Sequence, residues 1–560
     1  MLSRWASEPI RLLFIPQACF KLNDYRQPVL TKAQQTLIYR YMRLRSAPWI
    51  LLGDVALNTT LDGSSTLDPR SPSSAGADTW PLPSEGGKNV DPAKLAKYSA
   101  KVSGDPTPHL TYMRQYMQRN QPPRPPVEKF GAGYQDYLQA PLQPLADNLE
   151  SITYEVFEKD PIKYDWYERA IASALMDWST EEKPTSSTTG AVVIAVVGSG
   201  RGPLVTRALR ASEATGVEVE VWAIEKNPNA YVLLQRHNEF EWGRRVNVVK
   251  TDMRAWKGPQ LEDGSFRHVD ILVSELLGSF ADNELSPECL DGVQHVLNPD
   301  CGISIPASYT AHLTPISTPK LHADLAGKSV SDKDVFDLPY VVMLHQHDYL
   351  STLCSKPASL ESSTPSSSST PDAFITPNVQ LCWEFKHPIS PTILAQSNLR
   401  RGGSAAGGYG GTHGGDGANE HNARFCKLTF PCTHRGTCHG LAGYFETVLY
   451  TSSDIDDPGS EDFDPDADAQ HVAVELSTNP ITMDRKSKDM ISWFPIYFPL
   501  RTPISFPDGA EVDVSMWRVT DDRKVWYEWG VEAFVRLDGG ERVRIGGGDV
   551  QSSKKNGCLM

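Results

Sequence analysis

The sequence has no continuous apolar run long enough to cross a bilayer, and no N-terminal apolar segment of the kind that forms a signal peptide. It is also poor in cysteine: nine are scattered over 560 residues and form no dense disulfide framework. We therefore expect a protein that has no membrane partner and works in a reducing compartment.

Basic residues are the minority among the charges. Lys and Arg number 54 against 69 Asp and Glu, which gives a formal net charge of −15. Proteins that bind nucleic-acid backbones need clustered Lys and Arg to displace counterions, so this balance argues against direct nucleic-acid binding. It favours basic partners, although solubility alone is a sufficient reason for net acidity.

The composition describes a folding chain with interruptions. Hydrophobic residues make up 40% of the 560 residues, which is enough for several domains with cores of their own. Ser, Pro, Gly and Asp gather in a few stretches without periodicity, and we expect disordered inserts there, at about 58–104, 355–371, 402–418 and 454–468. At the start of the third insert, Arg401-Gly402-Gly403 has the form of a modifiable RGG site, with a solvated loop as the plainer interpretation.

The N-terminal region has a β-α-β pattern. Apolar runs predict strands at 10–15 and 49–53, and an amphipathic pattern predicts a helix at 32–45 between them. A further helix is expected at 110–119. Parallel strands need covered faces, and two or three such units cannot close a barrel. This region is therefore expected to need a partner or additional chain.

The central region predicts a nucleotide-binding type of sheet. Asp160 and Pro161 form a typical helix start, and apolar residues recur at helical spacing to about 178. A buried strand is predicted at 192–197, followed by the turn Gly198-Ser199-Gly200-Arg201-Gly202-Pro203. Small residues there let the backbone approach an anionic ligand at the next helix. The third glycine comes one position early for the dinucleotide motif, which weakens that interpretation.

Polar residues stand at the ends of the next strands. Glu225 ends the strand after the glycine turn, where a carboxylate can accept hydrogen bonds from both ribose hydroxyl groups. Asp252 and Met253 end the following strand, where they would contact an adenine amino group and its ring. The carboxyl ends of strands in an open α/β sheet are where such folds bind ligands. These residues therefore predict a nucleoside-cofactor site.

Two glutamates follow the fourth strand, in the stretch "SELLGSFADNE" at 274–284. Glu275 shares the sheet edge with the cofactor residues, and the loop returns Glu284. Two close carboxylates repel each other unless a cation lies between them. A guanidinium meets this need, because it is planar, keeps its charge and matches a carboxylate with paired donors. The pair predicts an arginine held beside a methyl donor; a glycosidase pair and a solvated loop are the alternatives.

Beyond Ser304 the pattern changes to short alternating segments, such as "KLTFPC", "YFETVLY" and "EVDVSMW", which are typical of antiparallel strands. One cluster in this region offers a different function. Its cysteines and histidines could form a zinc site, although they lack the paired CxxC spacing and lie in strand-like sequence: Cys426, Cys432, His434, Cys438 and His439.

With these motifs assembled, the chain resembles the protein arginine methyltransferase five family, the type II branch that forms symmetric dimethylarginine. The glutamate loop and "YEVFEKDPIKY" are its most specific motifs, and the glycine turn alone is not specific. The stretches that carry the resemblance are "LESITYEVFEKDPIKY" (149–164), "VVGSGRGPLV" (196–205), "IEKNPNA" (224–230), "SELLGSFADNELSPECLDG" (274–292), "HGLAGYFETVLY" (439–450) and "SWFPIYFP" (492–499).

The resemblance implies roles for particular residues. S-adenosylmethionine would be the cofactor, with contacts from Tyr154, Lys163, Tyr164, Gly198, Pro203, Glu225, Asp252 and Met253. Glu275 and Glu284 would be the catalytic pair, and no metal is needed. Substrate contacts would come from Phe157, which is associated with symmetric product, from Trp493, which would stack on the guanidinium, and from backbone groups of Leu277 and Phe494. By themselves, Phe157 and Trp493 would pass for core residues.

The resemblance also implies the fold class: a partial TIM-type β/α barrel, a Rossmann-like S-adenosylmethionine-binding domain and a C-terminal β-barrel with a dimerisation segment. We expect these at 1–122, 123–304 and 305–560. The stretch "RWASEPIRLLFIP" matches the last third of the first barrel, so its earlier strands are expected to be missing. In the family a WD-repeat propeller partner docks on this barrel, so the loss of the earlier strands puts docking of that partner in doubt.

The implied activity is methylation of arginine in basic Arg-Gly-rich proteins, such as histones and spliceosomal proteins, in the cytoplasm and nucleus. The implied assembly is a homo-oligomer. The alternative is a protein of another class, a scaffold that keeps the methyltransferase fold without its activity.

Overall fold

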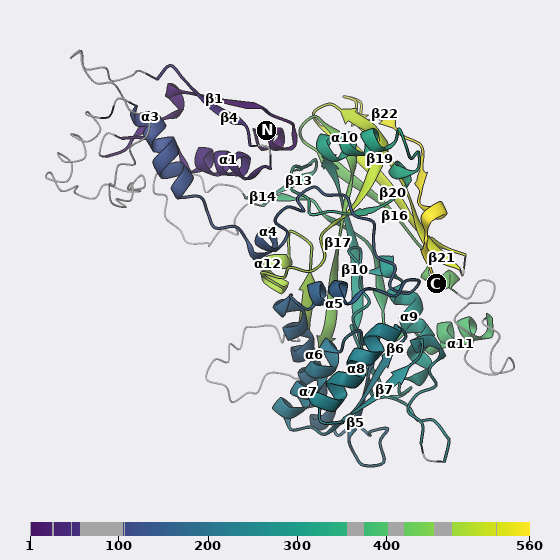
Figure 1. Cartoon of the computed structure of the whole chain (residues 1–560). Coiled ribbons are helices and arrows are strands. Elements are labelled where there is room, and N and C mark those ends of the chain that lie inside the picture. Colours follow the sequence, from purple (N-terminus) through teal and green to yellow (C-terminus); the bar gives the residue numbers. More distant parts are fainter. Residues whose placement is uncertain are drawn as a thin grey trace, which may run out of the picture. The chain divides into compact units, whose positions relative to one another are not determined.

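The computed structural model describes residues 2–24, 27–45, 47–55, 105, 107–261, 263–355, 374–400, 419–452, 473–521 and 523–560 (Figure 1). The chain forms two compact units: Met1–Arg124 with His345–Asp348, and Pro125–Leu344 with Tyr349–Met560. Apart from Ser355, the predicted inserts and Arg401-Gly402-Gly403 lie outside the described residues. No helix within the described ranges is both long and apolar enough to cross a membrane.

The smaller unit contains the predicted β-α-β pattern. Strands β1 (Leu12–Pro16) and β4 (Trp49–Gly53) pair in parallel, and α1 (Lys32–Arg43) connects them. Helix α1 begins with a capping box, in which the Thr31 side chain accepts from the Gln34 backbone and the Gln34 side chain accepts from Thr31. The helix predicted at 110–119 is wound partly as a π-helix, with α3 at Pro108–Thr111 and the π segment η3 at Tyr112–Met117. The unit also contains η1 (Leu2–Ser7), η2 (Gln17–Cys19), β2 (Lys21–Leu22) and β3 (Pro28–Val29).

The larger unit contains a parallel sheet of order β7-β6-β5-β8-β9. The first strand of the motif, β5, is central, and the chain proceeds to one side through β6 and β7 before it returns to the other side with β8. This reversal places the carboxyl ends of β5, β6 and β8 next to one another at a topological switch point. The strands are β5 (Val192–Val197), β6 (Val219–Glu225), β7 (Val246–Lys250), β8 (Ile271–Ser274) and β9 (Ile303–Ile305).

Both faces of this sheet are buried, which explains the unbroken apolar run of β5. Val192, Ile194 and Val196 pack in one cluster with residues of α6 and α7, while Val193 and Ala195 belong to a second cluster on the opposite face. Figure 1 shows α6, α7 and α8 beside the sheet. The helices of this part are α4 (Pro126–Phe130), α5 (Ser151–Phe157), α6 (Pro161–Thr180), α7 (Pro203–Thr215), α8 (Pro228–Phe240) and α9 (Ser286–Val293).

The rest of the larger unit is built on two antiparallel sheets, as the alternating segments predict. One follows the order β11-β19-β17-β10, with β15 beside β10 and β18 beside β17; the other follows β16-β20-β21-β22. Strands β23 (Gln551–Ser552) and β24 (Cys558–Leu559) pair with β21. The main strands are β10 (Ser308–Ser317), β11 (Tyr340–Val341), β15 (Gln380–Lys386), β16 (Arg424–Cys432), β17 (Gly436–Thr451), β18 (Ala473–Ser477), β19 (Ile496–Phe506), β20 (Ala510–Thr520), β21 (Lys524–Arg536) and β22 (Arg542–Gly547).

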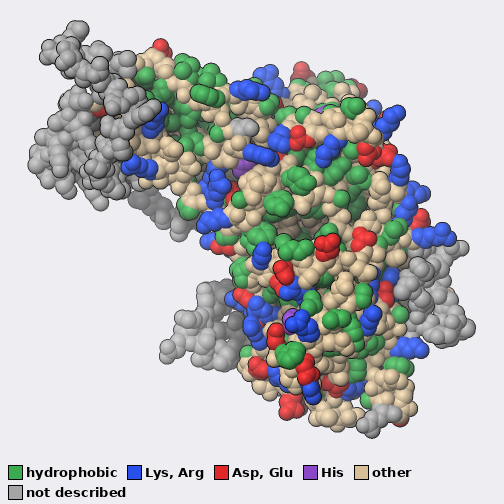
Figure 2. Space-filling model, in the orientation of Figure 1, with side chains coloured by type: hydrophobic (Ala, Val, Ile, Leu, Met, Phe, Trp, Pro, Cys, Tyr) green, Lys and Arg blue, Asp and Glu red, His purple; other side chains and the backbone are tan. Residues whose placement is uncertain are grey.

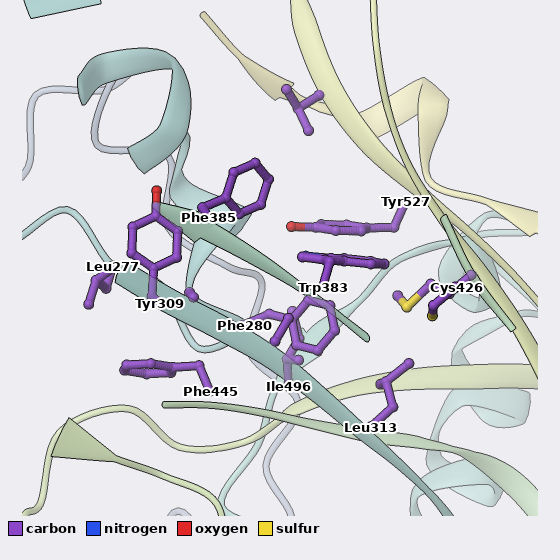
Figure 3. Packing of buried hydrophobic residues seen from close by; sticks show 14 of the residues in the cluster. Leu277, Phe280, Tyr309, Leu313, Trp383, Phe385, Cys426, Phe445, Ile496 and Tyr527 are labelled. Carbon is purple, nitrogen blue, oxygen red and sulfur yellow. The ribbon is translucent and has the colours of Figure 1, made fainter. Parts of the chain in front are cut away.

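One hydrophobic cluster joins the parallel sheet to the antiparallel sheets. It contains Val193 of β5. It also contains Phe280 of the glutamate loop, Phe445 of β17 and Tyr527 of β21, which Figure 3 labels. Because this core is shared, the two regions form a single compact unit, and the domain limits given above stay predictions. On the face that Figure 2 shows, acidic and basic side chains of this unit are interspersed and do not form a patch of one sign.

Candidate active site

A pocket of about 710 Å³ lies at the carboxyl edge of the parallel sheet. The strand ends, helices α5 and α6, and the segment 491–494 supply its walls. The structure brings every residue predicted for cofactor binding, substrate binding or catalysis to this one pocket, although their individual roles stay predictions. These residues are Tyr154, Phe157, Lys163, Tyr164, Gly198, Pro203, Glu225, Asp252, Met253, Glu275, Leu277, Glu284, Trp493 and Phe494.

The glycine turn after β5 forms a close-fitting cradle. Gly198 and Gly200 have positive φ angles of 69° and 56°, a region that side-chain-bearing residues rarely adopt. A Cβ at Gly198 would lie 2.9 Å from the Leu276 side chain, and a Cβ at Gly200 would lie 3.0 Å from the Tyr154 ring. Larger residues at these positions would therefore fill the cradle. Helix α7 begins at Pro203, so its free N–H groups start beside the turn.

Glu225 is fixed in the pocket by the backbone. Its two carboxylate oxygens accept from the N–H groups of Gly200 and Asn227, each at 2.7 Å. Burial raises the pKa of Glu225, while these donors oppose the rise. Each carboxylate oxygen has two lone pairs, so both can still accept a further hydrogen bond. This geometry fits a pair of ribose hydroxyl groups.

Asp252 has a partner that the sequence interpretation missed. The Arg254 guanidinium donates to both oxygens of Asp252, at 3.0 and 2.9 Å. Burial alone would raise the pKa of Asp252, but Arg254 lowers it below its ordinary value. Asp252 therefore stays ionised at the edge of the pocket. The two residues are close in sequence, but only the turn η4 (Met253–Ala255) directs them toward each other.

Lys163 and Glu275 form a partly buried ion pair beside three aromatic rings. The Lys163 Nζ lies 3.0 Å from a Glu275 oxygen, and Lys163 is 1% exposed. The same Nζ lies 4.7 Å from the ring centre of Trp493, 4.8 Å from that of Tyr164 and 5.3 Å from that of Phe157. Burial by itself would lower the pKa of Lys163, but the Glu275 carboxylate raises it above its ordinary value. We call these three rings with Glu275 the cation cage.

Glu284 faces the same pocket without such a partner. Within the described part of the chain, no donor forms a hydrogen bond with it. Burial, and then the charge of Glu275, raise the pKa of Glu284 well above its ordinary value, and Lys163 only partly opposes this. Two carboxylates held this close repel each other, so a cation bound between them would stabilise the ionised form of Glu284.

Trp493 is held in an unfavourable backbone conformation. Its φ angle is 62°, which is uncommon for a bulky residue. Its indole N–H donates to the Leu277 carbonyl at 2.7 Å, and the preceding residues Ile491 and Ser492 donate backbone N–H bonds to Asp160 at 3.0 and 2.7 Å. The Leu277 N–H donates to Glu275 at 3.3 Å, so both backbone groups of Leu277 already have partners within the chain.

Asp160 thus does more than the helix cap that the sequence predicts. It caps α6 by accepting from the Lys163 N–H at 3.2 Å, and its other oxygen holds the segment that carries Trp493. One carboxylate therefore positions two members of the site. A helix start in sequence gives no sign of this second contact, which comes from a segment over 300 positions away.

Comparisons with known proteins agree with this site. Residues 126–305 match the family model described as PRMT5 arginine-N-methyltransferase, residues 308–555 match the PRMT5 oligomerisation domain, and residues 1–119 match the PRMT5 TIM barrel domain. Protein arginine N-methyltransferase skb1 of Schizosaccharomyces pombe is 36% identical over 562 residues, which cover 100% of this chain and 70% of that protein. The chain belongs to the PRMT5 family.

Other relatives give the same result. Protein arginine N-methyltransferase 5 of Xenopus laevis is 36% identical over 538 residues, covering 96% of this chain and 64% of that protein. The Oryza sativa subsp. indica protein of the same name is 35% identical over 536 residues, covering 95% and 65%. The chain thus spans about two thirds of the length of these relatives.

Membership of the PRMT5 family confirms the fold class, with TIM-barrel, Rossmann-like methyltransferase and C-terminal β-rich parts, and it assigns S-adenosylmethionine as the cofactor. The chain carries the family's arginine-N-methyltransferase and oligomerisation domains. The glycosidase alternative is therefore wrong. The zinc alternative finds no support either, because among the described residues no three His, Cys, Asp or Glu side chains gather closely enough to hold a metal.

Proposed function

We propose that this PRMT5-family chain transfers methyl groups from S-adenosylmethionine to an ω-nitrogen of a peptidyl arginine, and that Glu275 and Glu284 are its catalytic pair. The observation that carries the proposal is the position of these two glutamates. Both line one pocket with the aromatic rings of the cation cage, and the half-buried Glu284 side chain lacks a donor among the described residues. A guanidinium supplies the positive charge and the paired N–H donors that this arrangement lacks.

The cofactor site is proposed from the residues around the glycine turn. Glu225 would bind the ribose hydroxyl groups, Asp252 and Met253 the adenine, and Tyr154, Lys163, Tyr164, Gly198 and Pro203 the remaining parts. The cradle at Gly198 and Gly200 supports this, since a side chain there would occupy the space. When bound, S-adenosylmethionine supplies an electrophilic methyl group on a sulfonium.

The protein's own contribution is positioning and proton removal. Glu275 and Glu284 would hold the guanidinium and localise its charge on one nitrogen, which leaves the other free to attack the methyl carbon. That nitrogen would bond to the methyl carbon as the S–CH3 bond of the sulfonium breaks and leaves a neutral thioether, and it would lose a proton to Glu284. The raised pKa of Glu284 suits this step, because a carboxylate that is more basic than usual is a better proton acceptor.

Substrate binding would use the aromatic members of the cage. Trp493 would stack on the guanidinium face, Phe157 would border the transferred methyl group, and Leu277 and Phe494 would contact the peptide. We propose monomethyl and symmetric dimethylarginine as products, on basic Arg-Gly-rich substrates such as histones and spliceosomal proteins. The family and the net charge of −15 support a basic substrate.

The assembly and location are proposed in the same way. The match of 308–555 to an oligomerisation domain supports a homo-oligomer. A WD-repeat propeller partner would dock on the N-terminal region, of which residues 1–119 match the TIM-barrel model. The cytoplasm and nucleus are the proposed locations, because the expected substrates occur there.

A labelled-methyl transfer assay tests the function. Purified chain is incubated with methyl-labelled S-adenosylmethionine and an Arg-Gly-rich peptide, with the same peptide carrying Lys at each Arg position as the control. We expect label only in the arginine peptide, and fragment-ion mass spectrometry should identify monomethyl and symmetric dimethylarginine. Purely asymmetric dimethylarginine would remove the type II assignment. Cofactor binding without any transfer would support the scaffold alternative.

A further inference from the structure

The backbone is unfavourable on both sides of Glu284. Ala281 has φ 64° and ψ −66°, and the Asp282 N–H donates to the Phe280 carbonyl at 2.8 Å, which makes Ala281 the centre of a classic-type γ-turn. Leu285 has φ 69° and ψ 28°, the left-handed region that a branched side chain disfavours. Such conformations persist only where surrounding contacts impose them. The short helix between them, η5 (Asp282–Glu284), therefore needs an external support.

Arg518 of β20 supplies contacts on both sides of Glu284. Its side chain has no exposed surface. Its Nε donates to the Asp282 carboxylate at 2.8 Å, and its two terminal nitrogens donate to the two oxygens of Glu288, also at 2.8 Å. Further bonds reach the carbonyls of Asn422 at 3.0 Å and Asp282 at 3.3 Å. These bonds engage all five N–H donors of the guanidinium.

The Asp282 end of this cluster is fixed by two aromatic residues as well. The Trp383 indole N–H donates to Asp282 at 2.7 Å, and the Tyr527 hydroxyl donates to the other oxygen. The two rings are stacked, with centroids 6.4 Å apart and an interplanar angle of 5°, as Figure 3 shows. The loop is thus tied to β15, β20 and β21 of the antiparallel sheets.

Arg518 also contributes positive charge beside two buried acids. Asp282 and Glu288 are both fully buried, and Arg518 is the cation that bonds to both. A buried carboxylate left without its cation is strongly unfavourable. Both acids lie within four positions of Glu284, so unpaired charge there would also act on Glu284.

We infer that Arg518 is a positioning residue for the reaction: it holds the Asp282–Glu288 segment in the strained conformation that directs Glu284 into the pocket, and its single positive charge offsets part of the negative charge of the acids on either side. Arg518 does not line the pocket and acts only through Glu284. This inference rests on the proposed function. It predicts that the planar fork of arginine, and not merely its charge, is needed, since Lys cannot bridge both acids with paired donors.

The experiment compares R518K and R518M with wild type and with a matched control, R542K. Arg542 of β22 also bridges two acids, Glu511 and Asp513, but lies outside the pocket and the glutamate loop. In R518K we expect kcat for the arginine peptide to fall about 10- to 100-fold, because small misplacements of a catalytic group are costly. The Kd for S-adenosylmethionine should stay within about threefold of wild type, since R518K leaves the cofactor residues in place.

The pH profile separates the effect of the Arg518 charge from its effect on the position of Glu284. In R518M the acidic limb of kcat/KM should move to higher pH, because two unneutralised carboxylates then lie near Glu284. In R518K, which keeps the charge, the limb should stay close to that of wild type. Should R518M not fold, the variant D282N/E288Q/R518M removes all three charges together. It should also have low kcat, but its acidic limb should not move to higher pH, because no unpaired carboxylate is left beside Glu284.

A wild-type kcat in folded R518K would overturn the inference. Equal losses of kcat and of cofactor affinity in R518K would do the same, since they would indicate a general structural role. If the wild-type chain itself transfers no methyl group, the proposed function fails and this inference fails with it. An active wild type with an equally active R518K overturns the inference alone.

Discussion

The Lys163 ammonium lies 3.0 Å from the Glu275 carboxylate and 4.7 Å from the centre of the Trp493 ring. A cation in this position is attracted by the carboxylate and by the ring face together. The site thus already contains the two kinds of group that would bind a guanidinium, a carboxylate and an aromatic ring face. Lys163 is also a predicted contact of the cofactor. The predicted binding sites of S-adenosylmethionine and of the substrate arginine therefore meet at this side chain.

Removing the Trp493 ring should weaken substrate binding more than cofactor binding. We expect W493L to raise KM for the arginine peptide about 5- to 30-fold, the equivalent of one desolvated cation–π contact. W493F keeps a ring face and should have a smaller effect. Leu and Phe both carry a Cβ, as Trp does, so the strain of a φ of 62° should be similar in the two variants. Steady-state kinetics decide this, and equal KM values for W493L and wild type would exclude the stacking role.

The activity should depend on pH through Glu284. This carboxylate must be ionised to hold the cation and accept the proton, and its pKa is raised by burial and by Glu275. The ionised fraction, and with it kcat/KM, should therefore fall as pH drops through this raised pKa, above the usual carboxyl range. A bound guanidinium lowers that pKa, so the acidic limb of kcat should lie at lower pH than that of kcat/KM. Coincident limbs at an ordinary carboxyl pKa would contradict the assignment.

Glu225 should control affinity for the cofactor. In E225Q, one charged acceptor is lost from a site where both oxygens are already fixed by backbone donors at 2.7 Å. We expect the Kd for S-adenosylmethionine, measured by calorimetry, to rise about 10- to 100-fold. The control is E218Q, an exposed glutamate just before β6. If E225Q bound the cofactor as tightly as E218Q does, Glu225 would have no role in ribose recognition.

Asp160 should matter for both stability and substrate binding. Its carboxylate accepts from the N–H groups of Lys163, Ile491 and Ser492. D160A leaves these buried donors without an acceptor, so we expect the free energy of unfolding to fall by about 1–3 kcal/mol. KM for the peptide should rise as well, because the segment carrying Trp493 is released. Denaturant unfolding measures the first effect. An unchanged KM in a destabilised D160A would limit Asp160 to a structural role.

The sequence predicted those site residues whose position follows from a local pattern, such as the end of a strand. Glu225, Asp252 and Glu275 could be placed together because each lies at or just after the end of a parallel strand, and the carboxyl ends of such strands share one edge. Phe157 and Trp493 carried no pattern that separates them from core residues, and only the family resemblance assigned them. Their approach depends on packing between segments distant in sequence.

The side chains that hold the site residues in place were less predictable from the sequence than the site residues themselves. Arg518 and Asp282 are 236 positions apart, and neither the strand pattern around Arg518 nor the loop pattern around Asp282 signals a buried ion pair. The two-residue step from Asp252 to Arg254 could have suggested that pair, but its geometry comes from a single turn of 3-10 helix. Side-chain contacts of this kind follow from the tertiary fold, which local periodicity does not specify.

The most direct test of the account is the rate of methyl transfer by E284Q. This variant keeps the shape of the side chain but cannot carry its charge or accept the proton. We predict that kcat for an Arg-Gly-rich peptide falls about 100- to 10,000-fold, while the Kd for S-adenosylmethionine stays close to that of wild type. An E284Q variant that methylates the peptide at the wild-type rate would contradict the claim that the two glutamates perform the reaction.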